Sequence, residues 1–334
     1  MDRRHSLKLL AGLPFVSSLA NAKQHSTWSR GADMPFAVQE IYPAKHKGEL
    51  LVAGGIGKRA GIPFFPDDVL AYCPSTDTWR THSTLPEARH HGALMSFDSR
   101  LFLFGGFNGG LTHIWRMRAS VLEHTEEGWQ PVIDMPAMQA EGVAATSPDQ
   151  RIHVVTGQSP RGTKNTKRAH HKEIRAHWSW HPSETTWRSH APIPTPRNSA
   201  TGGWVGDTLI VTGGRTAAGN LDTTECYNLT EDTWHSARPL PLPQAGTASV
   251  VVDDGLIVFG GEIFTPSAGV FKEVWHYSLK RDAWTALPPL PEPRHGLGAV
   301  RFGANAYVVG GARKPGGSGT SRAVEIFDLS AYLS

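Results

Sequence analysis

The sequence is poor in cysteine, in net charge and in long apolar runs, and each shortage excludes a class of protein. The 334 residues contain two cysteines, Cys73 and Cys226, which are too few for a disulfide framework, so the fold must be held by its own core. Beyond the first 25 residues no stretch approaches the roughly 18 consecutive apolar residues that a membrane helix needs. We therefore expect no membrane span.

The small net charge argues against a nucleic-acid partner. Lysine and arginine together number 33, against 30 for aspartate and glutamate, which gives a net charge of +3. Removing residues 1–22, which carry three basic residues and one acidic residue, lowers the net charge to +1. A general nucleic-acid binder needs a clear basic excess, so we predict no nucleic-acid partner.

The first 22 residues are similar to a bacterial export signal. Arg3 and Arg4 precede an apolar stretch, and Ala20-Asn21-Ala22 places small residues where a signal peptidase cleaves. The paired arginines resemble a twin-arginine motif, which implies export in the folded state. The general secretory route and a short N-terminal helix are the alternatives. We predict a signal peptide at 1–22, a mature domain at 23–334 and a periplasmic location.

A motif that repeats six times decides the fold class. Tryptophan recurs every 47 to 58 residues, and seven residues after each tryptophan comes a proline preceded by methionine, leucine or isoleucine. Nineteen residues beyond the proline, five of the six repeats reach a Gly-Gly pair, whereas the third repeat has a slightly longer run to Gly157-Gln158. The six tryptophans are Trp28, Trp79, Trp129, Trp187, Trp234 and Trp284.

Each repeat contains the strands of one propeller blade. The Gly-Gly pair ends a short apolar run, such as residues 50–53, and a tyrosine or another large residue stands seven positions before the next tryptophan. Four short strands per repeat are the content of one blade. After Phe327 the chain stops where the next tryptophan is due, and Trp28 has no earlier strands of its own. We predict an all-β, six-bladed propeller closed three-plus-one by the N-terminal strand, which removes the exposed sheet edge.

The succession of Gly-Gly, tyrosine and tryptophan, as in Gly54-Gly55, Tyr72 and Trp79, resembles the kelch motif. The likeness covers residues 26–334 and implies a kelch β-propeller. This motif is specific for the fold and says little about function. We interpret the repeated tryptophans as packing between blades.

Aligning the repeats with one another locates a candidate site. Loops after each proline and after each Gly-Gly pair should share one mouth of the central channel, where polar groups that converge are typical of a site for a small polar molecule. Carboxylates and imidazoles there can exchange protons with sugar hydroxyls. The predicted catalytic residues are Glu40, His91, Glu141 and Glu262. The predicted ligand-binding residues are Gln39, Arg89, His90, Arg197, Asn198, Arg215, Arg294 and His295.

Two interpretations stay open for the arginines of this set. A guanidinium group can hold a ligand carboxylate with two parallel hydrogen bonds. Arg89, Arg197 and Arg294 stand three residues after their prolines and can instead brace the carbonyl groups of a neighbouring loop.

The third repeat carries the longest insertion, at residues 159–177, and the insertion is strongly basic. It can act as a lid that attracts an anionic ligand, or it can be a solvated flexible loop. Its histidines, with the nearby His181, lack a recognised metal-ligand spacing, and we predict no metal and no cofactor. The basic residues of the insertion are Arg161, Lys164, Lys167, Arg168, Lys172 and Arg175.

Beyond the kelch motif, the chain resembles the bacterial N-acetylneuraminate epimerase family of sialic acid mutarotases. The run Gly54-Gly55-Ile56-Gly57-Lys58 and the long insertion in the third repeat carry this likeness, which implies a periplasmic sugar ligand. Arg215 and Leu221 stand where that family has its glutamate and arginine, so Glu262 of the next repeat is the candidate substitute. Galactose oxidase is also a kelch propeller, but its seven blades and its copper site on a Tyr–Cys crosslink do not match six repeats.

Two functions from different classes follow. The first is an exported propeller that binds a small acidic or acetamido sugar at the channel mouth and acts as a mutarotase or epimerase. The alternative is a non-enzymatic protein-interaction module that uses the same loop rim. The aromatic residues of the loops suit that alternative. They are Phe64, Phe65, Trp115 and Phe264.

Overall fold

The computed structural model describes residues 27–333 apart from residues 60, 111 and 112. The predicted signal peptide at 1–22 lies outside the described residues, so export stays a prediction. The described residues form β-strands and two single-turn 3-10 helices, η1 (Arg168–His170) and η2 (Ser330–Tyr332). No helix in this part of the chain is long and apolar enough to cross a membrane. Both cysteines are free. The predicted all-β class is confirmed.

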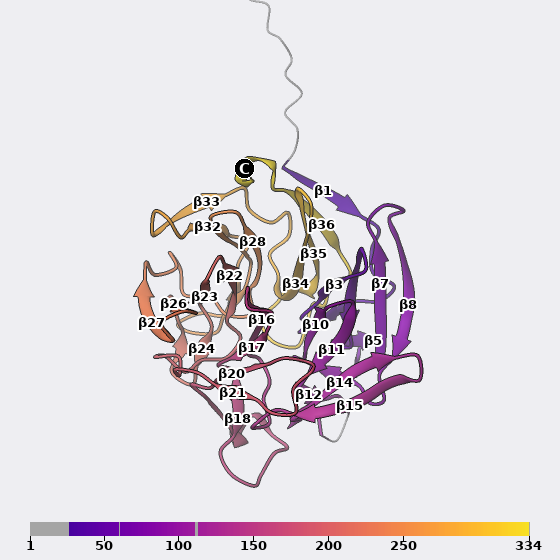
Figure 1. The fold of residues 1–334 in the computed structure, drawn as a ribbon. Coiled ribbons are helices and arrows are strands. Elements are labelled where there is room, and N and C mark those ends of the chain that lie inside the picture. The colour runs from indigo at the N-terminus through magenta and orange to yellow at the C-terminus, as the bar shows by residue number, and fades with distance from the viewer. Residues whose placement is uncertain (1–26, 60, 111–112, 334) are drawn as a thin grey trace, which may run out of the picture.

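Six four-stranded antiparallel sheets form the framework of the described residues (Figure 1). Five of the sheets each come from one stretch of the chain, and the last combines strands from both ends of the described residues. From the centre outwards they are β3 (Ala44–His46), β4 (Glu49–Ala53), β7 (Asp68–Cys73) and β8 (Thr78–Thr84); β10 (Ala93–Phe97), β11 (Arg100–Phe104), β14 (Ser120–Thr125) and β15 (Gly128–Asp134); β16 (Val143–Thr146), β17 (Ile152–Val155), β20 (His177–Trp180) and β21 (Arg188–Ser189); β22 (Thr201–Val205), β23 (Thr208–Thr212), β26 (Thr224–Asn228) and β27 (Thr233–Ala237); β28 (Ala248–Val252), β29 (Gly255–Phe259), β32 (Val274–Ser278) and β33 (Ala283–Leu287); and β34 (His295–Phe302), β35 (Asn305–Ala312), β36 (Val324–Asp328) and β1 (Trp28–Gly31).

The last of these sheets joins the two ends of the described chain. β1 pairs with β36 in antiparallel register, so that Trp28 lies opposite Phe327. Their rings meet edge to face with centroids 4.8 Å apart. The inner strands also contact one another in turn, from β3 through β10, β16, β22 and β28 to β34, and β34 contacts β3. The all-β fold with its repeated sheets is consistent with a β-propeller.

The repeated tryptophans connect neighbouring sheets. The indole N–H of Trp79 donates to the carbonyl of Ala32, and that of Trp234 donates to the carbonyl of Ala191. Each acceptor lies four residues after the tryptophan of the preceding repeat. Trp28 continues the pattern, because its N–H donates to the carbonyl of Pro288, four residues after the last tryptophan. This geometry agrees with the packing role that the repeat predicts.

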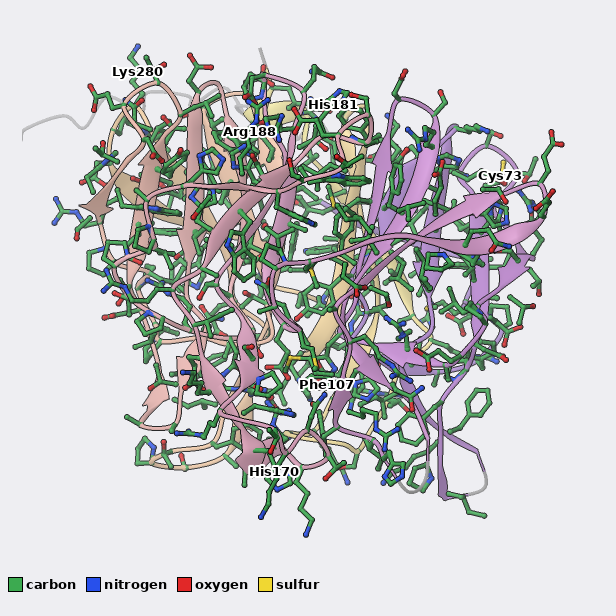
Figure 2. The ribbon with its side chains drawn as sticks, turned by 60° about the horizontal axis from the view of Figure 1, so that its bottom comes forward. Cys73, Phe107, His170, His181, Arg188 and Lys280 are labelled. Carbon is green, nitrogen blue, oxygen red and sulfur yellow. The ribbon has the colours of Figure 1, made fainter. Side chains whose placement is uncertain are left out.

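Short hairpins gather at one end of the sheets, which we call the mouth face: the end formed by the loops after the prolines and after the Gly-Gly pairs. Figure 2 shows His170 of a mouth-face loop at one end of the molecule and Cys73, His181, Arg188 and Lys280 toward the other. The short strands of this face are β2 (Val38–Gln39), β5 (Ile56–Arg59), β6 (Ile62–Phe64), β9 (Arg89–His90), β12 (Phe107–Asn108), β13 (Arg116–Met117), β18 (Gln158–Pro160), β19 (His171–Glu173), β24 (Arg215–Thr216), β25 (Gly219–Asn220), β30 (Glu262–Ile263) and β31 (Gly269–Val270).

Two histidines are buried side by side in the third sheet. His153 on β17 and His177 on β20 are fully buried, and their Nδ1 and Nε2 atoms lie 2.8 Å apart. Burial, with the nearby His190 and Arg151, lowers the pKa of His153 to about 3, and burial beside His153 and His190 likewise lowers the pKa of His177. Both imidazoles are therefore neutral in the folded protein at pH values where the unfolded chain, with a histidine pKa of about 6.5, binds protons.

The buried pair should make the protein sensitive to acid. A lowered folded-state pKa contributes stability that is complete above about pH 6.5 and is lost as the pH falls toward about 3. Each such histidine steepens the slope of unfolding free energy against pH by about 1.4 kcal/mol per unit in that window. We expect His177→Gln to reduce this slope in urea unfolding measured from pH 4 to 7, whereas the exposed control His235→Gln should leave it unchanged. Equal slopes in all three proteins would contradict this account.

Candidate functional site

Six backbone hydrogen bonds form a circle at the mouth. The residue five positions after each proline donates its N–H to the carbonyl of the equivalent residue in the preceding repeat, and Glu40 of the first repeat donates to Gly296 of the last. The N···O distances run from 2.7 to 3.4 Å. The six residues are Glu40, His91, Glu141, Ser199, Gly246 and Gly296.

All six residues of the circle have a positive φ, between 54° and 66°. Glycine adopts this left-handed conformation freely, and the fifth and sixth repeats have glycine there. A residue with a Cβ costs about 1–2 kcal/mol in the same conformation. The positive-φ backbone conformation therefore does not require the glutamate, histidine, glutamate and serine of the first four repeats. Strained residues of this kind often mark functional sites.

His91 lies between two carboxylates. Its Nε2 is 2.9 Å from Glu40 Oε2 and 3.4 Å from Glu141 Oε1, although it is aligned for a hydrogen bond with neither. Its Nδ1 is 2.6 Å from Nδ1 of His90, whose Nε2 faces the carbonyl oxygen of Ile114 at 2.8 Å. A carbonyl only accepts, so His90 Nε2 carries the proton of this neutral ring and His91 Nδ1 donates to His90. The other ring nitrogen of His91, Nε2, faces the two carboxylates.

The charges of the mouth keep its carboxyl groups ionised. Burial alone would raise the pKa of Glu40, but His91, His295 and Arg215 outweigh burial and hold that pKa well below its usual range. Burial is likewise outweighed at Glu141, where Arg168, His91 and Arg215 lower the pKa. Both groups are therefore ionised at neutral pH, where they accept hydrogen bonds and do not donate them.

Two arginines flank the circle, and each lies over an aromatic ring. Arg168 Nη2 is 3.0 Å from Glu141 Oε1, and its guanidinium lies 4.6 Å from the ring centre of Trp115. Arg215 Nη1 is 2.6 Å from Glu262 Oε1, and its guanidinium lies 5.4 Å from the ring centre of Phe264. Burial would lower the pKa of Arg215, but Glu141 and Glu262 outweigh it and raise that pKa. Both cations are thus held in place by a buried carboxylate on one side and a ring on the other.

His295 and Glu262 complete the set. His295 Nδ1 lies 3.4 Å from Glu262 Oε2 and 3.7 Å from Glu40 Oε1 without a hydrogen bond, while its Nε2 faces the carbonyl of Lys314 at 3.0 Å. Glu262 Oε2 accepts the N–H of Gly316 at 2.8 Å. The fully buried His295 therefore presents an unpartnered ring nitrogen to two carboxylates, a place where a bound polar group would find hydrogen-bonding partners.

A pocket of about 310 Å³ opens above these groups. Below the circle a smaller cavity of about 130 Å³ continues between the inner strands, and Tyr42 lies against it. Burial, with the charges of Glu141 and Glu40, raises the pKa of Tyr42 well above its usual value, so the phenol stays protonated. The upper pocket is lined by Glu40, Trp115, Arg168, Arg215, Glu262 and Phe264 among others.

Comparison with known proteins gives the repeat its family. Residues 130–311, more than half of the chain, match the family described as KLHDC2/KLHL20/DRC7 Kelch-repeats domain. The chain belongs to the kelch-repeat family. The chain is 26% identical to Kelch-like protein terF of Aspergillus terreus over 183 residues (53% of this chain and 39% of that protein). It is 26% identical to Kelch-like protein 35 of Mus musculus over 137 residues, and 28% identical to Beta-scruin of Limulus polyphemus over 121 residues.

These alignments cover only parts of the proteins. They span 41% and 36% of this chain for the mouse and Limulus proteins, respectively. This chain covers 22% of the mouse protein and 12% of Beta-scruin, so it matches well under two thirds of each relative's length. The kelch assignment therefore rests on the family match over residues 130–311, and no activity of a whole relative is transferred to this chain.

Three of the arginines that we assigned to ligand binding lie elsewhere in the kelch framework. Arg89, Arg197 and Arg294 are buried, and each donates from Nη1 to the carbonyl of the first glycine of its repeat's Gly-Gly pair, at 2.6 to 3.2 Å. Arg197 and Arg294 also bind Glu225 and Glu325, which are buried as well. Their placement favours the second interpretation, because these guanidinium groups are engaged in bracing loops. Gln139 and Gln244 make the equivalent bond in their repeats.

The other predicted site residues are brought together. Gln39, His90, Asn198 and His295 each stand one position before the circle and pair with the residue that follows a Gly-Gly pair, in agreement with the alignment of repeats. Asn198 accepts from Arg215 Nε at 3.2 Å, which joins these two predicted ligand-binding residues. Their roles toward a ligand stay predictions.

Sequence reasoning missed the individual importance of Arg168 and Tyr42. Arg168 lies inside the insertion, which has no counterpart in other repeats, so no alignment marks it. Tyr42 could have been found: it stands seven residues after its proline, where the other repeats have only Ala93, Val143, Thr201, Ala248 and Gly298.

The bracing role of Arg197 makes a prediction about stability. Arg197→Ala would leave Glu225 buried without its partner, which typically costs about 3–5 kcal/mol. The matched control Arg80→Ala breaks an exposed pair with Glu49 and should cost less than about 1 kcal/mol. Equilibrium urea unfolding measures both. A loss of stability at Arg197 no larger than at Arg80 would contradict the brace and favour a role at the surface.

Proposed function

We propose that this kelch chain is a protein-interaction module that binds its partner with the mouth face. One observation carries the proposal. Of the four large apolar side chains that are most exposed in the described residues, three lie on mouth-face loops: Ile62 (62% exposed), Phe264 (46%) and Met138 (42%). Phe264 also lines the pocket, and exposed apolar groups on a face that holds a pocket are typical of an interaction site. The kelch-repeat relatives support the same role.

The scaffold that we propose for this face is a six-bladed propeller closed by β1. The pairing of β1 with β36, the contacts of β34 with both β28 and β3, and the bond from Glu40 to Gly296 support this proposal. A closed ring holds all mouth-face loops in fixed relative positions, so that side chains from different repeats can act together on one partner. Such preorganisation lowers the entropic cost of binding.

Selection from a random-peptide display library tests this function. The protein should enrich peptides whose binding falls on the order of tenfold when Phe264 or Ile62 is changed to glutamate, because anchors at the centre of an interface carry most of the binding energy. Val132→Glu is the matched control, since Val132 is also exposed (42%, against 46% for Phe264) but lies on the outer strand β15. No enrichment, or enrichment that all three variants reduce equally, would contradict a binding role for the mouth face.

A second candidate function, a mutarotase for an acidic or acetamido sugar, is favoured by the buried Glu40–His91–Glu141 group. An ionised carboxylate can accept the proton of the anomeric hydroxyl while His91 gives a proton to the ring oxygen, so that the ring C–O bond breaks and an open-chain carbonyl forms. Return of the protons after rotation of the carbonyl closes the other anomer. Both protons are restored at the end of the cycle.

Anomer exchange of freshly dissolved N-acetylneuraminate, followed by proton NMR, tests this second candidate. A mutarotase should accelerate the exchange, and Glu40→Gln or Glu141→Gln should reduce that acceleration by about 10²–10⁴, because both changes keep the shape but remove the proton acceptor. An exchange rate that the wild-type protein leaves untouched would exclude the enzymatic role for this sugar.

A further inference from the structure

The hairpin of the third repeat, residues 158–175, presents a set of unpaired cations, and we call it the basic arm. It consists of β18, η1 and β19 on the mouth face. Five of its basic side chains are exposed, and none of the five forms an ion pair within the described residues. The single acidic residue of the arm, Glu173, faces inwards and accepts hydrogen bonds from Gln158 and Asn198. The exposed basic residues are Arg161, Lys164, Lys167, Lys172 and Arg175.

The arm is anchored and is not a solvated flexible loop. Asn165 binds the backbone of Met117 in the second repeat twice, as acceptor from its N–H and as donor to its carbonyl, both at 2.9 Å. His171 is buried against Phe107, and Arg168 reaches down to Glu141. The backbone of the arm is therefore held beside the pocket, so that less backbone entropy has to be lost on binding.

Two of the cations are fixed individually. Arg161 Nε donates to the carbonyl of His171 at 2.7 Å, and Arg175 Nε donates to the carbonyl of Ile193 at 2.8 Å. Each guanidinium keeps its two amino groups for an incoming acceptor. Because the whole chain is nearly neutral, such a concentration of positive charge on one hairpin gives the mouth face a local field that its overall charge does not show.

Building on the proposed protein-interaction role, we propose that the basic arm binds an acidic segment of the partner protein beside the pocket. A positively charged surface is complementary to a negatively charged partner, so we expect the bound segment to be acidic. Apolar contacts beside the cations favour a peptide over a polyphosphate: the exposed Met138 lies against the arm, with its sulfur 3.0 Å from Asn165 Nδ2.

The experiment uses the full chain, a peptide selected by it from the display library, and a charge-reversed arm. In the variant Lys164→Glu/Lys167→Glu/Lys172→Glu, all three changed side chains are exposed and form no ion pair within the described residues, so folding should be unaffected. The matched control Lys47→Glu/Lys280→Glu/Arg281→Glu makes the same change of charge at exposed turns away from the mouth face. Binding is measured by fluorescence polarisation at several salt concentrations, with a single-stranded oligonucleotide of equal charge as a second probe.

We expect enriched peptides to be rich in aspartate and glutamate, and we expect the arm variant to bind them at least tenfold more weakly, mainly through slower association. The control variant should bind as the wild-type protein does. Peptides without acidic enrichment whose binding still depends on Phe264 would overturn the acidic-partner inference and leave the proposed function standing. Equal loss in both variants, or equally tight binding of the oligonucleotide, would overturn the inference as well. Failure to enrich any peptide would contradict the proposed function itself.

Discussion

The circle of backbone hydrogen bonds at the mouth is the constraint on which the candidate site depends. Each repeat contributes one N–H and one carbonyl to it, and both belong to a residue with a positive φ. Because the bond partners are in neighbouring repeats, side chains that are about 50 residues apart in the sequence meet at the centre. His91 thereby lies within 3.4 Å of carboxylates from the first and the third repeat.

Bringing carboxylates together in a buried place is unfavourable unless cations accompany them. At the mouth, imidazole and guanidinium groups from four repeats accompany the carboxylates. Each of these groups faces at least one of the three glutamates: His91, His295, Arg168 and Arg215. The arrangement leaves unpartnered nitrogen atoms on His91 and His295, so a ligand can bind there without breaking an existing hydrogen bond. The mutarotase candidate uses this property directly, whereas the interaction role depends on the exposed side chains around it.

Most of the fold and part of the site could be predicted from the sequence. Because Trp28 has no earlier strands of its own, the sequence predicted that the N-terminal strand joins the last sheet, and β1 pairs with β36. The aligned positions Glu40, His91 and Glu141 meet at the mouth, as the alignment of repeats implied. The arginines three residues after the prolines could not be assigned, because a guanidinium suits a ligand carboxylate and a backbone carbonyl equally well. Two repeats have glutamine at the same position. Because a glutamine amide can also donate a hydrogen bond to the loop carbonyl, this favours the bracing role. Arg168 depends on the conformation of an insertion that no other repeat shares.

The central claim is that all six repeats are joined in one circle at the mouth, and native-state amide hydrogen exchange tests it most directly. The amides of residues 40, 91, 141, 199, 246 and 296 should exchange slowly, with a common protection that falls only on global unfolding, because opening any one bond requires separating two repeats. Rapid exchange at Glu40, with slow exchange at the other five, would contradict the account by showing that the first and last repeats are not joined there.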